Sequence, residues 1–504
     1  MAHQPTRFIA VLTALVVAAG ACGSDRDASE PSTPPDSTAA TPTPDATTPD
    51  ATTPAGATTD SAAPDTAPDT APDSAPDTTV APVPMFGDAP WPCGPGDGGN
   101  TDDGSEVGVT TDSISIATGD DAGYAASPGL SHEITDAMEA MVAACNDLGG
   151  INGRTITLNY YDAKLFEVPA AMQSACDADN FFLVGEGWAF DSNQEEIRLG
   201  CGLPAVPTYA VSAAFSHGAD VYMGVPNPAD ELTSGFFAQI AELFPEESKR
   251  VATLTGAFSA TQETRDKLVE VAPAFGWEFA MTTLESNPVG EADWTPFVKQ
   301  IQDSGAEMIS WQGTCLPHLL LFAQTAKVNG LDVPIVVDSN LYTAECAEAN
   351  TDGALDNLYV RMSFVPFEDA SQNPATQDYV DLIAEHGGDT ALLGVQAVSS
   401  FLLWATQASA CGATLTRQCV LENLADTHSW TGHGLHAETD PGGNHPPKCT
   451  SVLHLVGGAY ERVVPTEPAS FECDDSWITA VTSTPALLAA RLDGNRISQQ
   501  FAAG

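Results

Sequence analysis

Residues 113–162 read SISIATGDDAGYAASPGLSHEITDAMEAMVAACNDLGGINGRTITLNYYD. Apolar and polar residues alternate over 113–117, which predicts a strand, and the apolar residues of 134–148 recur every three or four positions, which predicts a helix. Gly149-Gly150 ends that helix, and a second strand over 155–160 follows. A strand, a helix and a strand in this order predict two parallel strands joined by a helical crossover.

The same alternation of strand and helix continues as far as residue 338, which is too many units for one sheet. We therefore expect an α/β protein with two doubly wound parallel-sheet lobes joined by a hinge. The first lobe is expected over 105–228 with a return segment at about 361–425. The second is expected over 229–360 with a return segment at about 426–473, before a C-terminal tail at 474–504. Ligands of such sheets bind beyond the carboxyl ends of the strands, here the cleft between the lobes.

Charge excludes one class of function. The 504 residues contain 17 Lys and Arg against 68 Asp and Glu, so the formal net charge is −51. Such a chain repels phosphate backbones, and we expect no binding to nucleic acid. Hydrophobic residues make up 43% of the chain, which is enough to build large cores.

The N-terminus is typical of an exported protein. Arg7 precedes an apolar run over 8–19, and we interpret residues 1–21 as a lipoprotein signal peptide that ends before Cys22. Lipidation of Cys22 would anchor the chain on the extracellular face of the cell membrane. The alternative is a plain secretory signal. Residues 22–90 are rich in Pro, Thr and Asp and are expected to form a disordered tether.

Ten cysteines remain once Cys22 is set aside, and an exported location permits disulfides. Their spacing suggests pairs without proving them, and a buried free thiol is the alternative for each. The expected pairs are Cys315–Cys346, Cys411–Cys419 and Cys449–Cys473, followed by Cys176–Cys201 and Cys93–Cys145.

Four segments, in this order, resemble one known family. They are GVTTDSI at 108–114, GGINGR at 149–154, DWTPFV at 293–298, and the helix expected at 316–330 before Val333. Together they resemble the extracellular solute-binding proteins of the branched-chain amino-acid type, which have the type I periplasmic binding protein fold. The resemblance covers about 105–465. It implies a two-lobed clamshell that captures a small molecule, an amino acid or amide-like solute, for an ATP-driven (ABC-type) permease.

The loops that follow the strands supply the candidate ligand-binding residues. The resemblance implies that the loops after the third and fourth strands hold a ligand carboxylate with backbone N–H and hydroxyl groups. Asn340 stands where amino-acid binders of the family carry an acid, and Asp338 is nearby. Four aromatic residues could clamp the solute or simply pack inside the lobes. The candidates are Glu186, Trp188, Tyr209 and Ala210 of the first lobe and Phe258, Trp311 and Asn340 of the second.

Other chemistry is weakly indicated. His428, His433, His436, His445 and Cys449 could ligate zinc, but their spacing is irregular, and exposed loop histidines are the better interpretation. The sequence lacks Gly-x-Ser-x-Gly, Gly-x-x-x-x-Gly-Lys and His-Glu-x-x-His motifs. We expect a monomeric binding protein with no catalytic residues, metal or cofactor. A sensor of the same fold that feeds no transporter, or an exported hydrolase, remains an alternative.

Overall fold

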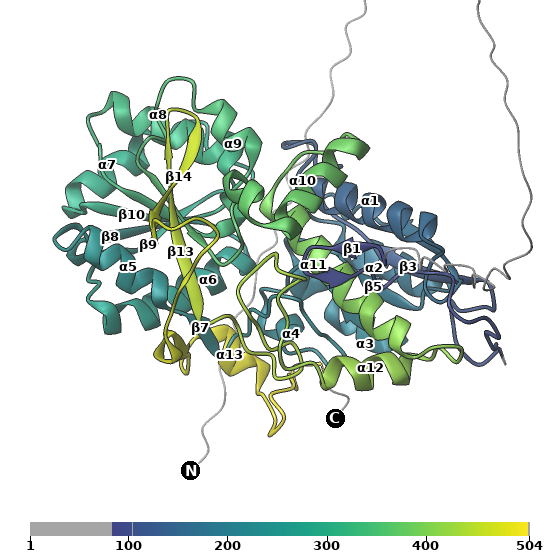
Figure 1. The fold of residues 1–504 in the computed structure, drawn as a ribbon. Helices are drawn as coiled ribbons and strands as arrows, with labels where there is room; N and C mark the ends of the chain where they lie inside the picture. The colour runs from purple at the N-terminus through teal and green to yellow at the C-terminus, as the bar shows by residue number, and fades with distance from the viewer. Residues whose placement is uncertain (1–82, 103, 502–504) are drawn as a thin grey trace, which may run out of the picture. The chain divides into compact units, whose positions relative to one another are not determined.

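The computed structural model describes residues 83–102 and 104–501, which belong to one compact unit (Figure 1). Cys22, the expected signal peptide and the expected tether as far as residue 82 lie outside the described residues. None of the described helices is long and apolar enough to cross a membrane.

The first sheet has four parallel strands in the order β4-β3-β5-β6. They span Ser113–Thr118 (β3), Thr155–Tyr160 (β4), Phe182–Val184 (β5) and Ala205–Val206 (β6). The helices of this part are α1 (Glu133–Asp147), α2 (Val168–Asp177), α3 (Glu195–Cys201) and the short α4 (Ala213–Ser216). The apolar face of α1 is buried through Ile134, Met138 and Met141, as its periodicity predicts.

The second sheet runs in the order β14-β13-β12-β11-β10-β8-β9, and β15 (Glu472–Cys473) also pairs with β13. Its parallel strands are β8 (Val251–Gly256), β9 (Phe279–Ser286), β10 (Met308–Gln312), β11 (Ile335–Val337) and β12 (Leu358–Met362). The strands β13 (Cys449–Val456) and β14 (Ala459–Val464) are antiparallel additions. The helices around the sheet are α5 (Gly235–Leu243), α6 (Ser259–Val271), α7 (Thr295–Ser304), α8 (Leu320–Val328) and α9 (Ala344–Ala349).

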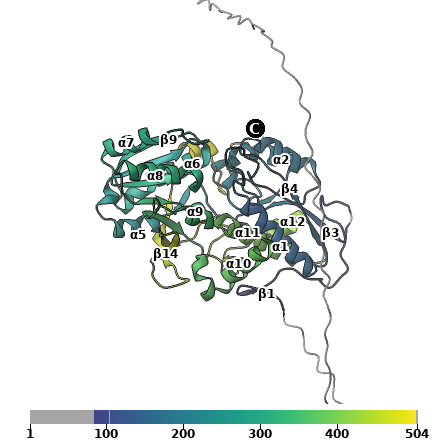
Figure 2. The same ribbon diagram turned by 90° about the horizontal axis from the view of Figure 1, so that it is seen from above.

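After β12 the chain returns to the first lobe. The helices α10 (Pro374–His386), α11 (Leu392–Ala410) and α12 (Arg417–Ala425) follow, and α11 packs against α1, β5 and β6. Figure 2 shows α10, α11 and α12 beside α1, apart from the helices α5 to α8. The helix α11 is apolar on most of its circumference, which is why it is buried.

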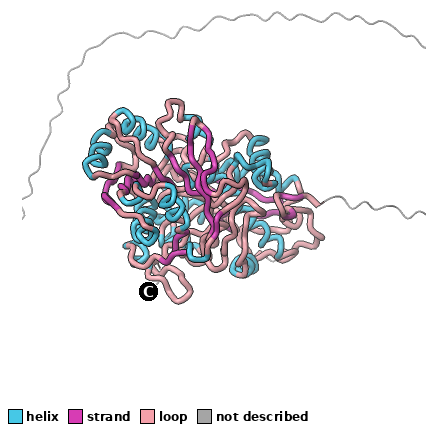
Figure 3. The backbone as a smooth tube through the Cα atoms, turned by 60° about the vertical axis from the view of Figure 1, so that its left-hand side comes forward, coloured by secondary structure: helices cyan, strands magenta, loops and turns pink. Residues whose placement is uncertain are grey.

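Three of the passages between the lobes, near residues 224, 364 and 437, are bonded to one another. Backbone hydrogen bonds join Val365 to Leu435 and Ala437 to Ser363, so the second and third passages run together. The Thr439 hydroxyl donates to the Gly224 carbonyl at 2.8 Å and ties the first passage to the third. In Figure 3 the helices lie on both sides of the strands, and pink loops make the connections.

Both ends of the described chain are folded onto this framework. The last residues of the expected tether form the short pair β1 (Met85–Phe86) and β2 (Ala89–Pro90), because Phe86 supplies an apolar side chain that can be buried. The expected tail contains β16 (Ile478–Ala480), which pairs with β7 (Glu231–Thr233), and the helix α13 (Pro485–Ala490).

Five disulfides join the ten cysteines of the described residues. They are Cys93–Cys145, Cys176–Cys201, Cys315–Cys346, Cys411–Cys419 and Cys449–Cys473, the same pairs that the sequence suggested.

Candidate functional site

A cavity of about 270 Å³ lies between the two lobes. Loops that follow the strands of both sheets line it, and so do the interlobe passages at Val225, Ser363 and Pro446. The carboxyl ends of parallel strands meet at one edge of each sheet, and these two edges face the cavity. Among the sequence-predicted residues, four line the cavity: Tyr209, Phe258, Trp311 and Asn340.

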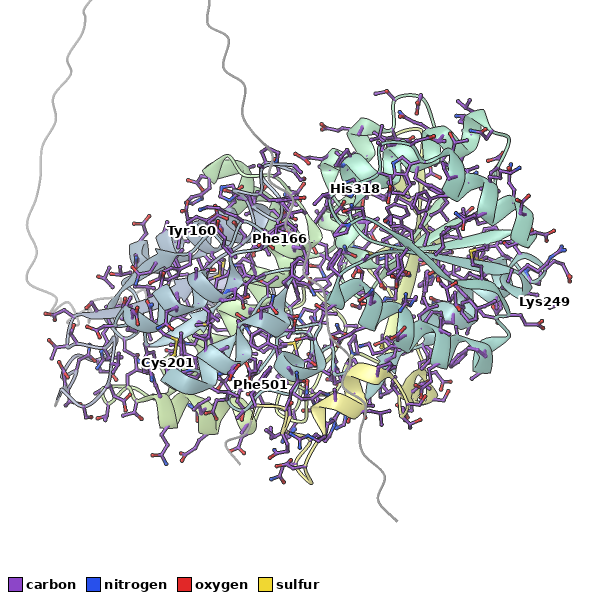
Figure 4. The ribbon with its side chains drawn as sticks, turned by 180° about the vertical axis from the view of Figure 1, so that it is seen from behind. Tyr160, Phe166, Cys201, Lys249, His318 and Phe501 are labelled. Carbon is purple, nitrogen blue, oxygen red and sulfur yellow. A yellow bond between two sulfur atoms is a disulfide. The ribbon has the colours of Figure 1, made fainter. Side chains whose placement is uncertain are left out.

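A row of aromatic rings connects the lobes at this cavity. Ring centroids are 5.7 Å apart for Tyr124 and Phe166, 5.5 Å for Phe166 and Phe190, and 5.5 Å for Phe190 and Phe258. Phe258 belongs to the second lobe and the other three to the first. Figure 4 labels Phe166 and His318 on the facing edges of the two lobes. Tyr124 and Phe258, at the two ends of the row, line the cavity, so its apolar lining includes a ring from each lobe.

Trp311 and Asn340 line the second-lobe side. Trp311 is only 2% exposed, and its ring lies 5.6 Å from Phe322 inside the lobe, so it both packs the core and walls the cavity. Its indole Nε1 has no hydrogen-bond partner among the described residues. The side-chain amide of Asn340 donates to the Gly313 carbonyl at 3.3 Å, which leaves its oxygen available to a ligand donor.

Tyr209 occupies the first-lobe side. A Cβ on Gly187 would stand 2.7 Å from a Tyr209 ring carbon, so the ring lies directly on the glycine backbone. Burial raises the pKa of the Tyr209 phenol well above its usual value, and the carboxylates of Asp121 and Glu186 add to the rise. The phenol therefore stays protonated and can donate one hydrogen bond.

The other three predicted residues do not line the cavity in this structure. Trp188 is fully buried and donates from its indole Nε1 to the Tyr161 carbonyl at 3.3 Å. Glu186 accepts from the Trp188 backbone N–H at 3.1 Å, and burial raises its pKa well above the usual value. Ala210 is buried in the first-lobe core.

Carboxylates of the chain itself hold the backbone N–H groups of the first-lobe loops. Asp191 accepts from Val211 N–H at 2.7 Å and Ser212 N–H at 2.9 Å. Asp121 accepts from Ala189 N–H and Leu165 N–H, each at 2.8 Å. Burial raises the pKa of each of these two aspartates to about 6. These loops are the ones that the sequence resemblance assigned to a ligand carboxylate.

Two cations of the second lobe were missed by sequence reasoning. Arg361 and Lys267 both line the cavity. Arg361 Nη2 pairs with Asp338 Oδ1 at 2.9 Å, whereas Lys267 Nζ donates to Asn227 Oδ1 at 2.8 Å and to the Pro228 carbonyl at 3.0 Å. Burial, together with the positive charge of Arg361, lowers the pKa of Lys267 to about 8. The sequence did contain one signal for Arg361, because it is the charged residue of the otherwise mostly apolar strand at 358–362.

One further carboxylate links the lobes beside the cavity. Glu263 of α6 accepts from the Ala213 backbone N–H, at the start of α4, at 2.8 Å. Burial raises the pKa of Glu263 to about 7, and the negative charge of Asp191 adds to the rise. Ser192 and Ser259 approach to 3.4 Å nearby, so the two lobes touch along this edge.

The histidine cluster is not uniformly exposed, so that interpretation was wrong for two members. His436 is 4% exposed and bonds Ser399 Oγ through Nε2, and burial lowers its pKa to about 4. His433 is also buried. His428 pairs with Asp440, and His445 pairs with Glu231. Within residues 83–102 and 104–501, no three His, Cys, Asp or Glu side chains are placed to hold a metal ion.

Comparisons with known proteins agree with this geometry. The profile of a family described as "Periplasmic binding protein" matches residues 117–459, which is more than half of the chain. No curated protein sequence matches the chain.

Several solved structures are similar in fold. A fatty acid ABC transporter substrate-binding protein from Thermomonospora curvata is 14% identical, with 71% of this chain and 93% of that one covered and a TM-score of 0.58. A leucine binding protein from Thermotoga maritima is 15% identical, with 70% and 98% covered and a TM-score of 0.58. A solute binding protein of an R. palustris ABC transporter, in complex with benzoate, is 16% identical, with 72% and 98% covered and a TM-score of 0.58. At these identities the likeness establishes the type I fold with its two lobes.

Proposed function

The chain belongs to the periplasmic binding protein family, and from this premise we propose that it captures a small molecule between its lobes and delivers it to an ABC-type permease. The observation that carries the proposal is the cavity, which residues of both lobes line together with the interlobe passages. A ligand that contacts both lobes favours the form in which they are close, and a permease can recognise that form. The fatty acid, leucine and benzoate-bound proteins of similar fold are consistent with a small organic solute.

The proposed location is the extracellular face of the cell membrane. Cys22 would carry the lipid anchor, and the Pro-rich segment after it would hold the binding domain away from the membrane. Replacing Cys22 by Ala should move the protein from the membrane fraction to the medium. Recovery of Cys22→Ala in the membrane fraction, or an unmodified mature N-terminus by mass spectrometry, would contradict the anchor.

Thermal-shift screening of the purified mature chain tests capture directly. A solute that binds only the folded state raises the melting temperature. At one hundred times its Kd it adds about 2.7 kcal/mol to the free energy of unfolding. A true ligand should be recovered chemically unchanged after incubation, because the proposal includes no reaction. Phe258→Ala, which removes the ring joining the aromatic row across the lobes, should reduce the shift. Conversion of the solute to a product would contradict the proposal.

A further inference from the structure

We propose that the solute is an organic monocarboxylate with an apolar body, and that Arg361 and Lys267 of the second lobe bind its carboxylate. The inference rests on the proposed function and deepens it by naming a class of solute. It also moves the anionic group away from the first-lobe loops, where the sequence resemblance placed it. Four observations carry it.

First, the first-lobe loops have few backbone donors left for an anion. The N–H groups of Val211 and Ser212 already donate to the Asp191 carboxylate, and that of Ala189 donates to Asp121. A ligand carboxylate at this edge would compete with these aspartates and would also meet their negative charge at close range.

Second, Arg361 has donors to spare. It follows Val360 near the carboxyl end of β12, its side chain is 24% exposed, and it pairs with Asp338 through Nη2. A guanidinium has five N–H donors in a planar fork that matches a carboxylate, and one Asp338 oxygen does not satisfy them. An anion in the cavity can therefore be bound by Arg361 without displacing Asp338.

Third, Lys267 has no ionic partner. In the described part of the chain no carboxylate oxygen lies within 4.0 Å of its Nζ, which donates only to neutral oxygens of Asn227 and Pro228. Nearby carboxylates are engaged elsewhere, since Asp230 pairs with Arg496 at 2.6 Å and Glu263 accepts from Ala213 N–H. An ammonium ion has three donors, so one remains for a ligand. An anion would relieve the repulsion between Lys267 and Arg361 that contributes to the lowered pKa of the lysine.

Fourth, the lining suits an apolar body and not an ammonium group. Its carboxylates, among the described residues, are Asp338 and Glu231, and Glu231 Oε2 is held by His445 Nδ1 at 2.7 Å and by Arg496 at 3.4 Å. Asp338 lies beside the positive charges of Arg361 and Lys267, which would repel the ammonium of an amino acid placed against it. The cavity also reaches the apolar side chains Leu232, Phe236, Phe237 and Leu268.

The test compares ligands that share a body and differ in head group. Octanoate, octanamide, octylamine and 2-aminooctanoate form one set, and benzoate, benzamide, benzylamine and phenylglycine form another. Each is titrated calorimetrically into the mature wild-type chain. In at least one set we expect the carboxylate to bind at least tenfold more tightly than the amide, the amine and the amino acid.

Variants locate the subsite. Arg361→Gln and Lys267→Gln should each weaken carboxylate binding at least tenfold and leave amide binding within about twofold, while Arg361→Lys should restore part of the loss. The double variant Asp338→Asn with Arg361→Gln removes both charges of this ion pair. It therefore leaves no unpaired Asp338 carboxylate that could cause misfolding. Arg265→Gln is the matched control, because Arg265 is on the same helix as Lys267 but pairs with Asp266 and Glu285 outside the cavity.

Two failures can be told apart. If in every set that binds an amide, amine or amino acid binds as tightly as its carboxylate, the inference is overturned and the proposed capture of a solute stands. The same holds if Arg361→Gln and Lys267→Gln bind the carboxylate normally. If none of the eight compounds binds, the inference is overturned, and the proposed capture is decided separately by the thermal-shift screen.

Discussion

Tyr209 shows how a single glycine shapes the first-lobe wall. Gly187 lies in the loop after β5, and its missing side chain lets the Tyr209 ring and Ile134 come close. A Cβ at this position would stand 2.6 Å from Ile134 Cδ1 and 2.7 Å from Tyr209 Cε1. The glycine is therefore needed for space, and the position of the tyrosine in the cavity depends on it.

Replacing Gly187 by Ala should destabilise the protein by about 1–3 kcal/mol, the usual cost of overpacking, and displace Tyr209. Gly200→Ala is the control: Gly200 is in helix α3 with no atom within 4 Å of its added Cβ, so that variant should be neutral or more stable by up to about 1 kcal/mol. Denaturant unfolding measures both changes. Equal stability of the two variants would contradict this account of Gly187.

At the residue scale, the sequence predicts well which loops reach the cavity. It predicts less well which side chains of those loops line it. Phe258 and Asn340 follow strands of a parallel sheet, and such positions share an edge. Trp188 follows a strand too, yet its indole turns inward toward the Tyr161 carbonyl, and loop conformation decides this. Lys267 and Arg361 were missed because the approach of two distant chain segments to one cavity is a tertiary property.

At the element scale, disulfides fasten helices and strands at their ends. Cys411, just after α11, bonds Cys419 in the first turn of α12, and Cys176 of α2 bonds Cys201 at the end of α3. Cys449 of β13 bonds Cys473 of β15 at a paired position of the sheet. Each bridge limits the freedom of the unfolded chain and thereby favours the folded one.

Breaking one of these bridges should lower the free energy of unfolding by about 2–4 kcal/mol and so lower the melting temperature. Reduction of all five bridges should lower the melting temperature further than the loss of one. The double variant Cys411→Ala with Cys419→Ala removes the bridge between α11 and α12 and leaves the other four. Thiol counting of the unreduced, denatured protein checks the pairing, with close to none free expected among the ten. Six or more free thiols are incompatible with the paired state.

The strand–helix alternation could be predicted from residue 113 to residue 338, because its apolar periodicities are clear. The helix expected from 316 begins as α8 at Leu320, after an irregular turn over Cys315–Leu319. The antiparallel pair β13–β14 was missed, although Gly457-Gly458 between two apolar runs is a hairpin signal.

At the scale of the whole molecule, several carboxyl groups hold protons more tightly when the protein is folded. Burial raises the pKa of Asp121 and Asp191 to about 6 and that of Glu263 to about 7. Such groups favour the folded state fully below their ordinary pKa, and their contribution is lost as the pH rises through 6–7. The pKa of His436 is lowered to about 4, so the folded state favours its neutral form. Its contribution to stability is therefore present above pH 6.5 and is lost as the pH falls from 6.5 toward 4.

We therefore expect the melting temperature to fall as the pH is raised from 5 to 8. Glu263→Gln removes one of these titrations and keeps an oxygen that can accept from Ala213 N–H, so its decrease should be smaller than that of the wild type. Calorimetry at several pH values, at constant ionic strength, measures the difference. A decrease as large as the wild type's would exclude Glu263 as a contributor.

The central claim is that a solute binds between the lobes and draws them together. Small-angle scattering of the mature chain, with and without a solute that calorimetry has shown to bind, tests it most directly. Both samples contain the same chain, so a difference in radius of gyration is attributed to the solute. The account predicts a smaller radius with the solute and a smaller change in Phe258→Ala at equal concentration. An unchanged radius at saturation, with normal affinity in Phe258→Ala, would contradict it.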